Sequence, residues 1–101
     1  MTYCVVWEFR PAPGRAAEFE EAYGGAGRWA RLFRRGEGYL GTELVVPTDS
    51  DGWYRTTDRW TSAAAYAAFR SAFAKEYQAL DAACEALTAE ERHVRSGLTG
   101  A

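Results

Sequence analysis

The spacing of apolar side chains changes at Thr61 and Ser62, and this change organises the expected structure. Before it, the segment Trp53–Thr61 alternates between two faces, as a strand does. After it, apolar residues recur every three or four positions over Ala63–Leu87, which is typical of an amphipathic helix. The Ser62 hydroxyl can accept a hydrogen bond from a free amide of the first helical turn. The pattern therefore predicts a strand that leads directly into a long helix.

Three further strands and a broken helical arm complete the expected secondary structure. Pro11–Gly14 ends the first strand, because proline cannot donate to a strand ladder. Gly24–Gly27 interrupts the arm, and Gly41 predicts a bulge or a close backbone approach. In order, the chain is expected to form a strand Tyr3–Arg10, a helix over 14–23, a helical segment Arg28–Arg35, strands Tyr39–Val46 and Trp53–Thr61, the helix Ala63–Leu87, a short helical turn over Thr88–Glu91, and a strand Arg92–Leu98.

The order of these elements predicts an α+β fold of the ferredoxin-like β-α-β-β-α-β type. Right-handed crossovers place both helices on one face of a four-stranded antiparallel sheet, with the first and third strands central. We expect a single domain that spans residues 1–101, because the chain has no linker, repeat or low-complexity segment.

The first strand has one strongly apolar face, formed by Tyr3, Val5, Trp7 and Phe9. We expect this face to be left bare by the helices. A bare apolar face of this size needs a partner, and the simplest partner is a second copy of the chain. The sequence thus predicts a homodimer with Trp7 at the centre of its interface.

Composition narrows the function. The net charge of −2 argues against a nucleic-acid partner, since phosphate contacts need a concentrated positive face. Hydrophobic residues make up 48% of the chain and aromatic residues 15%, which favours a packed core, an aromatic pocket, or both. Cys4 and Cys84 are expected to be two buried thiols. We expect a cytoplasmic protein without membrane contact, because no signal or transmembrane segment is evident.

The candidate chemistry is sparse. One histidine and two separated cysteines give no metal-ligand spacing, and no nucleophile motif occurs. Glu8 stands in the most apolar strand, either at its frayed end or in a pocket that would raise its pKa. His93 lies on the last strand, beside the first, so a contact between these two residues is conceivable. Asp58, between Thr57 and Arg59, is expected to be paired on the surface.

Aromatic side chains gather where the third strand meets the long helix. Trp60, Tyr66 and Phe69 either pack in the core or form part of a ligand cage. Trp29, on the interrupted helical arm, is a further candidate for such a cage.

Three phrases of the sequence, Val6–Gly14, Gly38–Glu43 and Asp58–Phe69, resemble the antibiotic biosynthesis monooxygenase-like family of the dimeric α+β barrel superfamily. The resemblance implies a homodimer whose two sheets close a barrel, with a pocket in each subunit between sheet and helices. It also implies oxidation of electron-rich phenols by molecular oxygen, without a metal or a bound flavin. In such chemistry the protein binds the substrate, removes a proton and shields the anion from water.

The match to the family's functional residues is partial. Some members carry a Trp and a Tyr six residues apart, which correspond to Trp60 and Tyr66 here. Those members have an Asn four residues before the Trp, where this chain has Thr56. Related haem-degrading members use an Asn, a Trp and a His at positions that hold Glu8, Phe69 and Ala79 here, so haem is disfavoured as a cofactor.

Two functional hypotheses result. The first is a cofactor-independent monooxygenase acting on an aromatic, polyketide-like or quinol substrate. Glu8 or His93 would be its base, and Trp60, Tyr66, Phe69 and Trp29 would contact the substrate. The second is a non-catalytic dimeric barrel that binds a small hydrophobic ligand or serves as an accessory subunit. A base deep in the pocket would favour the first hypothesis.

Overall fold

The computed structural model describes residues 1–99, so the last two residues of the expected domain lie outside the described part. Its elements are β1 (Thr2–Pro11), α1 (Ala16–Tyr23), α2 (Arg28–Phe33), β2 (Tyr39–Val45), β3 (Tyr54–Trp60), α3 (Ala63–Ala72), α4 (Ala74–Cys84), the 3₁₀ turn η1 (Glu85–Leu87) and β4 (Thr88–Thr99).

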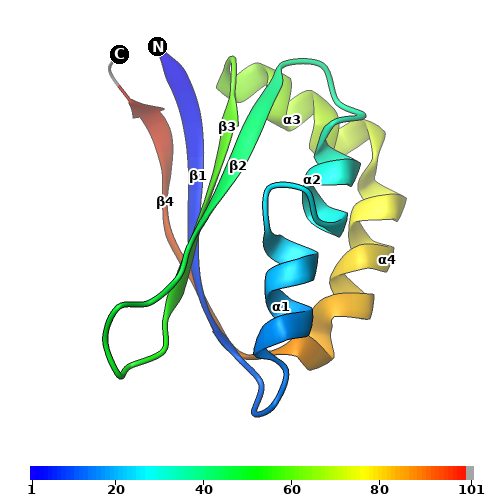
Figure 1. Cartoon of the computed structure of the whole chain (residues 1–101). Coiled ribbons are helices and arrows are strands. Elements are labelled where there is room, and N and C mark those ends of the chain that lie inside the picture. Colours follow the sequence, from blue (N-terminus) through cyan, green and yellow to red (C-terminus); the bar gives the residue numbers. More distant parts are fainter. Residues whose placement is uncertain (100–101) are drawn as a thin grey trace.

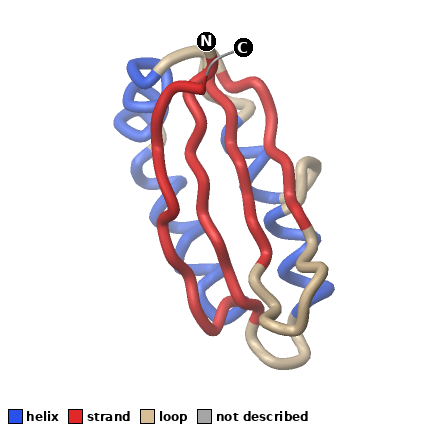
Figure 2. The backbone as a smooth tube through the Cα atoms, turned by 90° about the vertical axis from the view of Figure 1, so that its left-hand side faces the viewer, coloured by secondary structure: helices blue, strands red, loops and turns tan. Residues whose placement is uncertain are grey.

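The four strands form one antiparallel sheet in the order β2-β3-β1-β4. Within residues 1–99, all helices lie against one face of this sheet (Figure 1), and the other face is free of helices (Figure 2). This architecture confirms the expected ferredoxin-like fold, with β1 and β3 as the central strands.

The helix after β3 begins as the sequence indicates, because the Ser62 hydroxyl accepts a hydrogen bond of 3.0 Å from the amide of Ala65. It does not continue unbroken to Leu87. The backbone of Phe73 leaves helical geometry at φ −114° and ψ 30°, which divides the segment into α3 and α4. Backbone hydrogen bonds still flank the break, so it is a kink. Every described helix is too short or too polar to span a bilayer.

The start of β4 corrects a second expectation. Thr88–Glu91 was expected to form a helical turn, but these residues are extended and pair with β1 from Phe9 to Pro11. The turn lies just before them, at Glu85–Leu87. Pairing with a neighbouring strand satisfies the backbone of Thr88–Glu91 more completely than a local capping interaction can.

The apolar face of β1 is directed toward the helices, which contradicts the expectation that it would be bare. The Phe9 ring lies 5.6 Å from that of Phe19 on α1, and the Tyr3 ring lies 5.8 Å from that of Tyr66 on α3. Trp7 shares this face and packs against the core, so it is not at the centre of a sheet-to-sheet interface. The helices direct aromatic side chains toward the sheet. The aromatic face of β1 packs against them because this arrangement removes the most apolar surface from water.

The opposite face of the sheet, here called the open face, is mainly polar. It carries the alternate residues of each strand: Cys4, Val6, Glu8 and Arg10 of β1, Arg55, Thr57 and Arg59 of β3, Glu43 and Val45 of β2, and Glu90, Arg92 and Arg95 of β4. Cys4 and Val6 are nonetheless buried. Both cysteines are buried and free, as expected.

Three irregularities interrupt the ladders, and one of them is a shift in the pairing of β1 with β4 between Arg10 and Pro11. The pairing of β2 with β3 shifts between Tyr39 and Gly41, where Gly41 has a φ of 143°, so the expected bulge is present. The pairing of β1 with β4 shifts by one residue, because Val6 pairs with Arg95 but Trp7 pairs with His93. Val94 is therefore an extra residue in β4.

The core offers a direct test of this packing. Phe19 is fully buried and contacts the rings of Phe9, Tyr23 and Tyr54. We expect Phe19→Ala to lower the free energy of unfolding by about 3–5 kcal/mol, since it leaves a cavity between α1 and the sheet. Urea denaturation measures the change. Leu40→Ala, at a residue that is 57% exposed, serves as the control and should change stability by less than about 0.5 kcal/mol.

Candidate functional site

A cavity opens between the sheet and the helices. Its empty volume is about 590 Å³, counting the part that is open to solvent. The cavity is lined by Val5, Trp7, Phe9, Tyr23, Trp29, Phe33, Thr42, Thr56, Asp58, Tyr66, Tyr77, Asp81 and Glu91. Aromatic rings dominate the wall, and a few polar groups interrupt it.

Alternation along β3 brings Asp58 into this cavity. Tyr54, Thr56, Asp58 and Trp60 share the face toward the helices, and each of them is buried. Because β3 is a central strand, both of its neighbours and the helices shield that face from water. Asp58 is only 9% exposed. The expectation that it is paired on the surface is therefore wrong.

Asp58 ends a short chain of hydrogen bonds. The Thr42 hydroxyl donates to Asp58 Oδ1 over 2.7 Å, and the Tyr39 hydroxyl lies 2.5 Å from Thr42 Oγ1. Since the single proton of Thr42 is directed at the carboxylate, Tyr39 is the donor to Thr42. Burial raises the pKa of Asp58 from 3.8 to about 6, although the hydrogen bond from Thr42 opposes the rise. The carboxyl can thus accept and release a proton near neutral pH.

Two tyrosines of the wall are held by an arginine outside the cavity. Arg70 donates to the Tyr66 hydroxyl over 3.0 Å, and its guanidinium lies 3.9 Å from the centre of the Tyr77 ring. Burial raises the pKa of Tyr77 to about 12, so its phenol stays neutral. These contacts fix the orientation of both rings toward the cavity.

The end of the cavity near α4 and the start of β4 is acidic. Asp81 and Glu91 line the cavity there, and a neighbouring hollow adds Glu85. Partial burial, together with the charges of Asp81 and Glu85, raises the pKa of Glu91. We call these three carboxylates the acidic mouth.

Four predicted substrate-binding residues fall into two groups. Tyr66 and Trp29 line the cavity. Trp60 and Phe69 are not among its lining residues, and they lie in the core at 0% and 2% exposure. The Trp60 ring lies 5.5 Å from that of Tyr66, so it supports the wall from behind.

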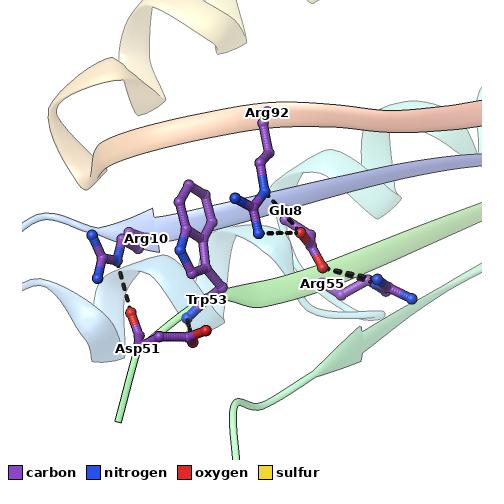
Figure 3. Close-up of polar contacts among 6 residues, drawn as sticks. All are labelled: Glu8, Arg10, Asp51, Trp53, Arg55 and Arg92. Carbon is purple, nitrogen blue, oxygen red and sulfur yellow. Dashed lines mark hydrogen bonds and ion pairs between the residues drawn. The ribbon is translucent and has the colours of Figure 1, made fainter. Parts of the chain in front are cut away.

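Glu8 is not placed where its expected role requires. It lies on the open face, where Oε1 pairs with Arg92 at 2.8 Å and Oε2 pairs with Arg55 at 2.9 Å (Figure 3). Hydrogen bonds from the two guanidiniums, first Arg92 and then Arg55, lower the pKa of Glu8, whereas a raised pKa was expected for a pocket residue. The Arg92 guanidinium also lies 3.9 Å from the centre of the Trp53 ring. Glu8 thus belongs to a charged cluster on the opposite side of the sheet from the cavity.

His93 lies at the edge of the site and does not contact Glu8. Its ring is 5.2 Å from that of Trp7, and Nε2 lies 2.8 Å from Ser96 Oγ. The side chain is exposed and is not among the residues that line the cavity. The contact with Glu8 that the sequence left open is not formed, because Glu8 faces the open side, where Arg92 pairs with it.

A sequence model of the antibiotic biosynthesis monooxygenase family matches residues 2–83. The chain belongs to this family. SnoaB from Streptomyces nogalater, a cofactor-independent oxygenase, is 28% identical and superposes with a TM-score of 0.70 over 97% of this chain and 95% of SnoaB. No curated protein matches the sequence.

More distant structures share the fold. A protein from Pseudomonas aeruginosa is 16% identical, with a TM-score of 0.68 over 99% of this chain and 95% of its own. A protein from Mycobacterium tuberculosis is 17% identical, with a TM-score of 0.67 over 100% of this chain and 99% of its own. At such identities the likeness shows the fold alone.

The raised pKa of the buried Asp58 carboxyl predicts how the stability of the protein depends on pH. The folded protein binds the Asp58 proton more tightly than the unfolded chain, so stability falls as pH rises from about 4 to about 7. We expect Asp58→Asn, which removes the buried charge, to raise the free energy of unfolding at neutral pH by roughly 1–3 kcal/mol. The gain should shrink toward pH 4, where the carboxyl of the folded parent is neutral. Urea denaturation at several pH values measures both.

Glu37→Gln is a suitable control, because Glu37 is exposed on a loop. The difference in free energy of unfolding between Glu37→Gln and the parent should not depend on pH. A stabilisation by Asp58→Asn that is equal at all pH values would mean that the carboxyl titrates normally.

Proposed function

We propose that this protein is a cofactor-independent monooxygenase that oxidises an electron-rich aromatic substrate with molecular oxygen. The observation that supports it best is the placement of Asp58, a buried carboxyl with a raised pKa, on the wall of an aromatic cavity. The likeness to SnoaB, a cofactor-independent oxygenase, agrees with this activity.

Asp58 takes the role of general base in this proposal. A carboxylate with a pKa near 6 is largely ionised at neutral pH, yet it is basic enough to remove a proton from an acidic phenol or an activated ring methylene. The hydrogen bond from Thr42 orients it. Glu8 and His93 lose this role, because Glu8 is paired with two arginines on the open face and His93 lies outside the cavity lining.

The remaining steps belong to the substrate and oxygen. With an anthrone, removal of a proton from the ring methylene gives an electron-rich anion, which transfers electrons to O₂. One oxygen atom becomes the new ring carbonyl and the other leaves as water, so that the methylene and O₂ yield a quinone and H₂O. The aromatic wall shields the anion from bulk water during these steps.

The aromatic side chains supply binding. Tyr66 and Trp29 would contact the substrate directly, together with Trp7 of β1. Trp60 and Phe69, which were expected to contact it, would act by holding Tyr66 and Phe33 in place.

Substitution of the base tests the proposal. We expect Asp58→Asn to lower kcat/KM for anthrone oxidation by roughly 100- to 10,000-fold, the usual contribution of a general base. Parent activity should fall as pH drops below about 6, because the carboxyl becomes protonated. Oxygen uptake, corrected for the spontaneous reaction at each pH, measures both.

Glu8→Gln is the matched control, a carboxyl-to-amide change in the same sheet. It should keep the parent rate. Loss of activity in Glu8→Gln but not in Asp58→Asn would return the base role to Glu8. If the parent takes up no oxygen with anthrones or quinols, the protein is instead a binder of a hydrophobic ligand or an accessory subunit.

We further propose that the protein is a homodimer that associates through the open face, in keeping with its family. The face carries both signs of charge, including Glu43 and Glu8 beside Arg59 and Arg55, so a second copy can pair with it in a complementary register.

Charge reversal tests this interface. Light scattering should give a dimer mass for the parent. Arg55→Glu combined with Arg59→Glu should give mainly monomer with an unchanged circular dichroism spectrum, because like charges would then face each other. Arg31→Glu, on the exposed side of α2, should stay dimeric. A dimeric double variant would place the interface elsewhere.

A further inference from the structure

We propose that Tyr39 and Thr42 are positioning residues for Asp58. Tyr39 directs the hydroxyl proton of Thr42 onto one oxygen of the Asp58 carboxylate, and the other oxygen is left free to take a proton from the substrate. The inference rests on the proposed function, because it takes Asp58 as the base. It adds how two residues of β2 keep this base charged and which of its oxygens reacts.

The sheet gives Asp58 a single polar partner among its directly paired neighbours. Asp58 pairs with Thr42 of β2 on one side and with Val5 of β1 on the other. Side chains of directly opposite residues in antiparallel strands lie close enough to touch. Val5 has no polar group in its side chain, whereas the Thr42 hydroxyl donates to Asp58 Oδ1 over 2.7 Å.

A bulge in β2 brings Tyr39 to the same face as Thr42. Residues three positions apart in a regular strand point to opposite faces of the sheet. The pairing of β2 with β3 skips Leu40, so Tyr39 and Thr42 both lie on the face toward the helices. Bulges are frequent beside active sites, where they redirect a side chain. Without the extra residue, the Tyr39 side chain would lie on the open face.

The Tyr39 side chain is held as a hydrogen-bond donor. Its ring lies 5.2 Å from that of Trp60 and 5.6 Å from that of Phe33. Burial raises the pKa of Tyr39, so its phenol keeps the proton at neutral pH. The phenol donates to Thr42 Oγ1 over 2.5 Å. Because this bond occupies the acceptor side of the Thr42 hydroxyl, the single proton of Thr42 is directed to the carboxylate.

The second oxygen of Asp58 is available to the substrate. Within residues 1–99, Oδ2 forms no hydrogen bond, yet it is not one of the polar atoms that lack both a partner and accessible surface. Oδ2 therefore has accessible surface, and Asp58 lines the cavity. In the proposed reaction, Oδ2 takes a proton of the ring methylene and the electron pair of the C–H bond stays on the substrate. The proton later joins the oxygen atom that leaves as water, which restores the carboxylate.

No cation of the cavity wall can replace Thr42 in this role. None of the described lining residues is a lysine, an arginine or a histidine, and the other titratable groups of the wall are Tyr23, Tyr66, Tyr77, Asp81 and Glu91. These groups are neutral or negative, so their charges cannot favour the ionised form of Asp58. Burial raises the pKa of Asp58, and the hydrogen bond from Thr42 opposes the rise.

Removal of the Thr42 hydroxyl tests the pair. Thr42→Val keeps the shape of the side chain, and we expect it to raise the pKa of Asp58 by roughly one to two units, since a hydrogen bond to a charged group is lost. NMR of protein with isotope-labelled aspartate carboxyls measures the titration, and Asp58→Asn identifies the signal. Thr42→Ser, which keeps a hydroxyl, should titrate as the parent does.

Thr57→Val is the matched control. Thr57 is adjacent to Asp58 in β3, but it lies on the open face. The same chemical change there should leave the titration of Asp58 unchanged. A shift in Thr57→Val as large as that in Thr42→Val would show that the loss of any neighbouring hydroxyl disturbs Asp58, and it would overturn the proposal.

Tyr39→Phe tests whether Tyr39 acts through Thr42. Alone, it should raise the pKa of Asp58 by less than about one unit, because the Thr42 hydroxyl remains but is no longer oriented. Combined with Thr42→Val, it should have no further effect. An equal effect of Tyr39→Phe with and without the Thr42 hydroxyl would overturn the role of Tyr39.

Oxygen uptake separates this proposal from the proposed function. With an anthrone, the fall of kcat/KM at low pH should move to higher pH in Thr42→Val by as many units as the NMR titration moves. A shifted titration without a shifted rate profile would overturn the use of Asp58 as the base, and with it the role of the pair in the reaction. If the parent takes up no oxygen, the oxygenase is rejected, and the NMR titrations alone decide whether the pair controls the charge of Asp58. An unchanged titration in Thr42→Val overturns the proposal at any activity.

Discussion

The structure depends on which face of β1 meets the helices. A central strand has two faces, and here only one of them carries a row of aromatic side chains. The helices bring their own rings, such as Phe19 and Phe69, which must be covered by apolar surface. Packing these groups against Trp7 and Phe9 buries the most apolar area. The position of the cavity and the polar character of the open face both follow from this choice.

The same packing raises the pKa of Asp58 and makes the burial of its charged form unfavourable. A carboxyl on the covered face of a central strand cannot be hydrated as it would be in water, so its charged form is disfavoured. Thr42 and Tyr39 offset part of that cost through their hydrogen bonds. Glu8 is the contrasting case in the same sheet, because two arginines stabilise its charge and leave it a weak base. The surroundings of the two carboxyls thus shift their pKa values in opposite directions, although their intrinsic acidities are similar.

Much of the fold could be predicted from the sequence, because periods of two and of three to four residues directly reflect strands and helices. The choice of face could not be predicted in the same way. Alternation shows that Tyr3 and Phe9 share a side, but it does not say which side the helices cover. The error placed Trp7 in an interface and Glu8 in a pocket.

Asp58 could have been found from the sequence with one more step. It shares its face with Trp60, and a tryptophan at the end of a central strand is a strong indication of the core side. The acidic mouth could not have been found, because it joins Asp81 of α4 to Glu91 of β4. That contact depends on the register of the last strand, which the sequence pattern leaves open.

The extra residue in β4 has a consequence for the distribution of charge between the two faces. Side chains of a strand alternate strictly, so one inserted residue reverses the inside and outside positions of all that precede it. Because Val94 is inserted, Glu91 faces the cavity beside Phe9, and Arg92 faces outward onto Glu8. In a β4 of regular register, Arg92 would pair with Phe9 and face the cavity, and Glu91 would pair with Arg10 on the open face. The inserted Val94 thus determines that a carboxylate of β4, and not a guanidinium, faces the cavity.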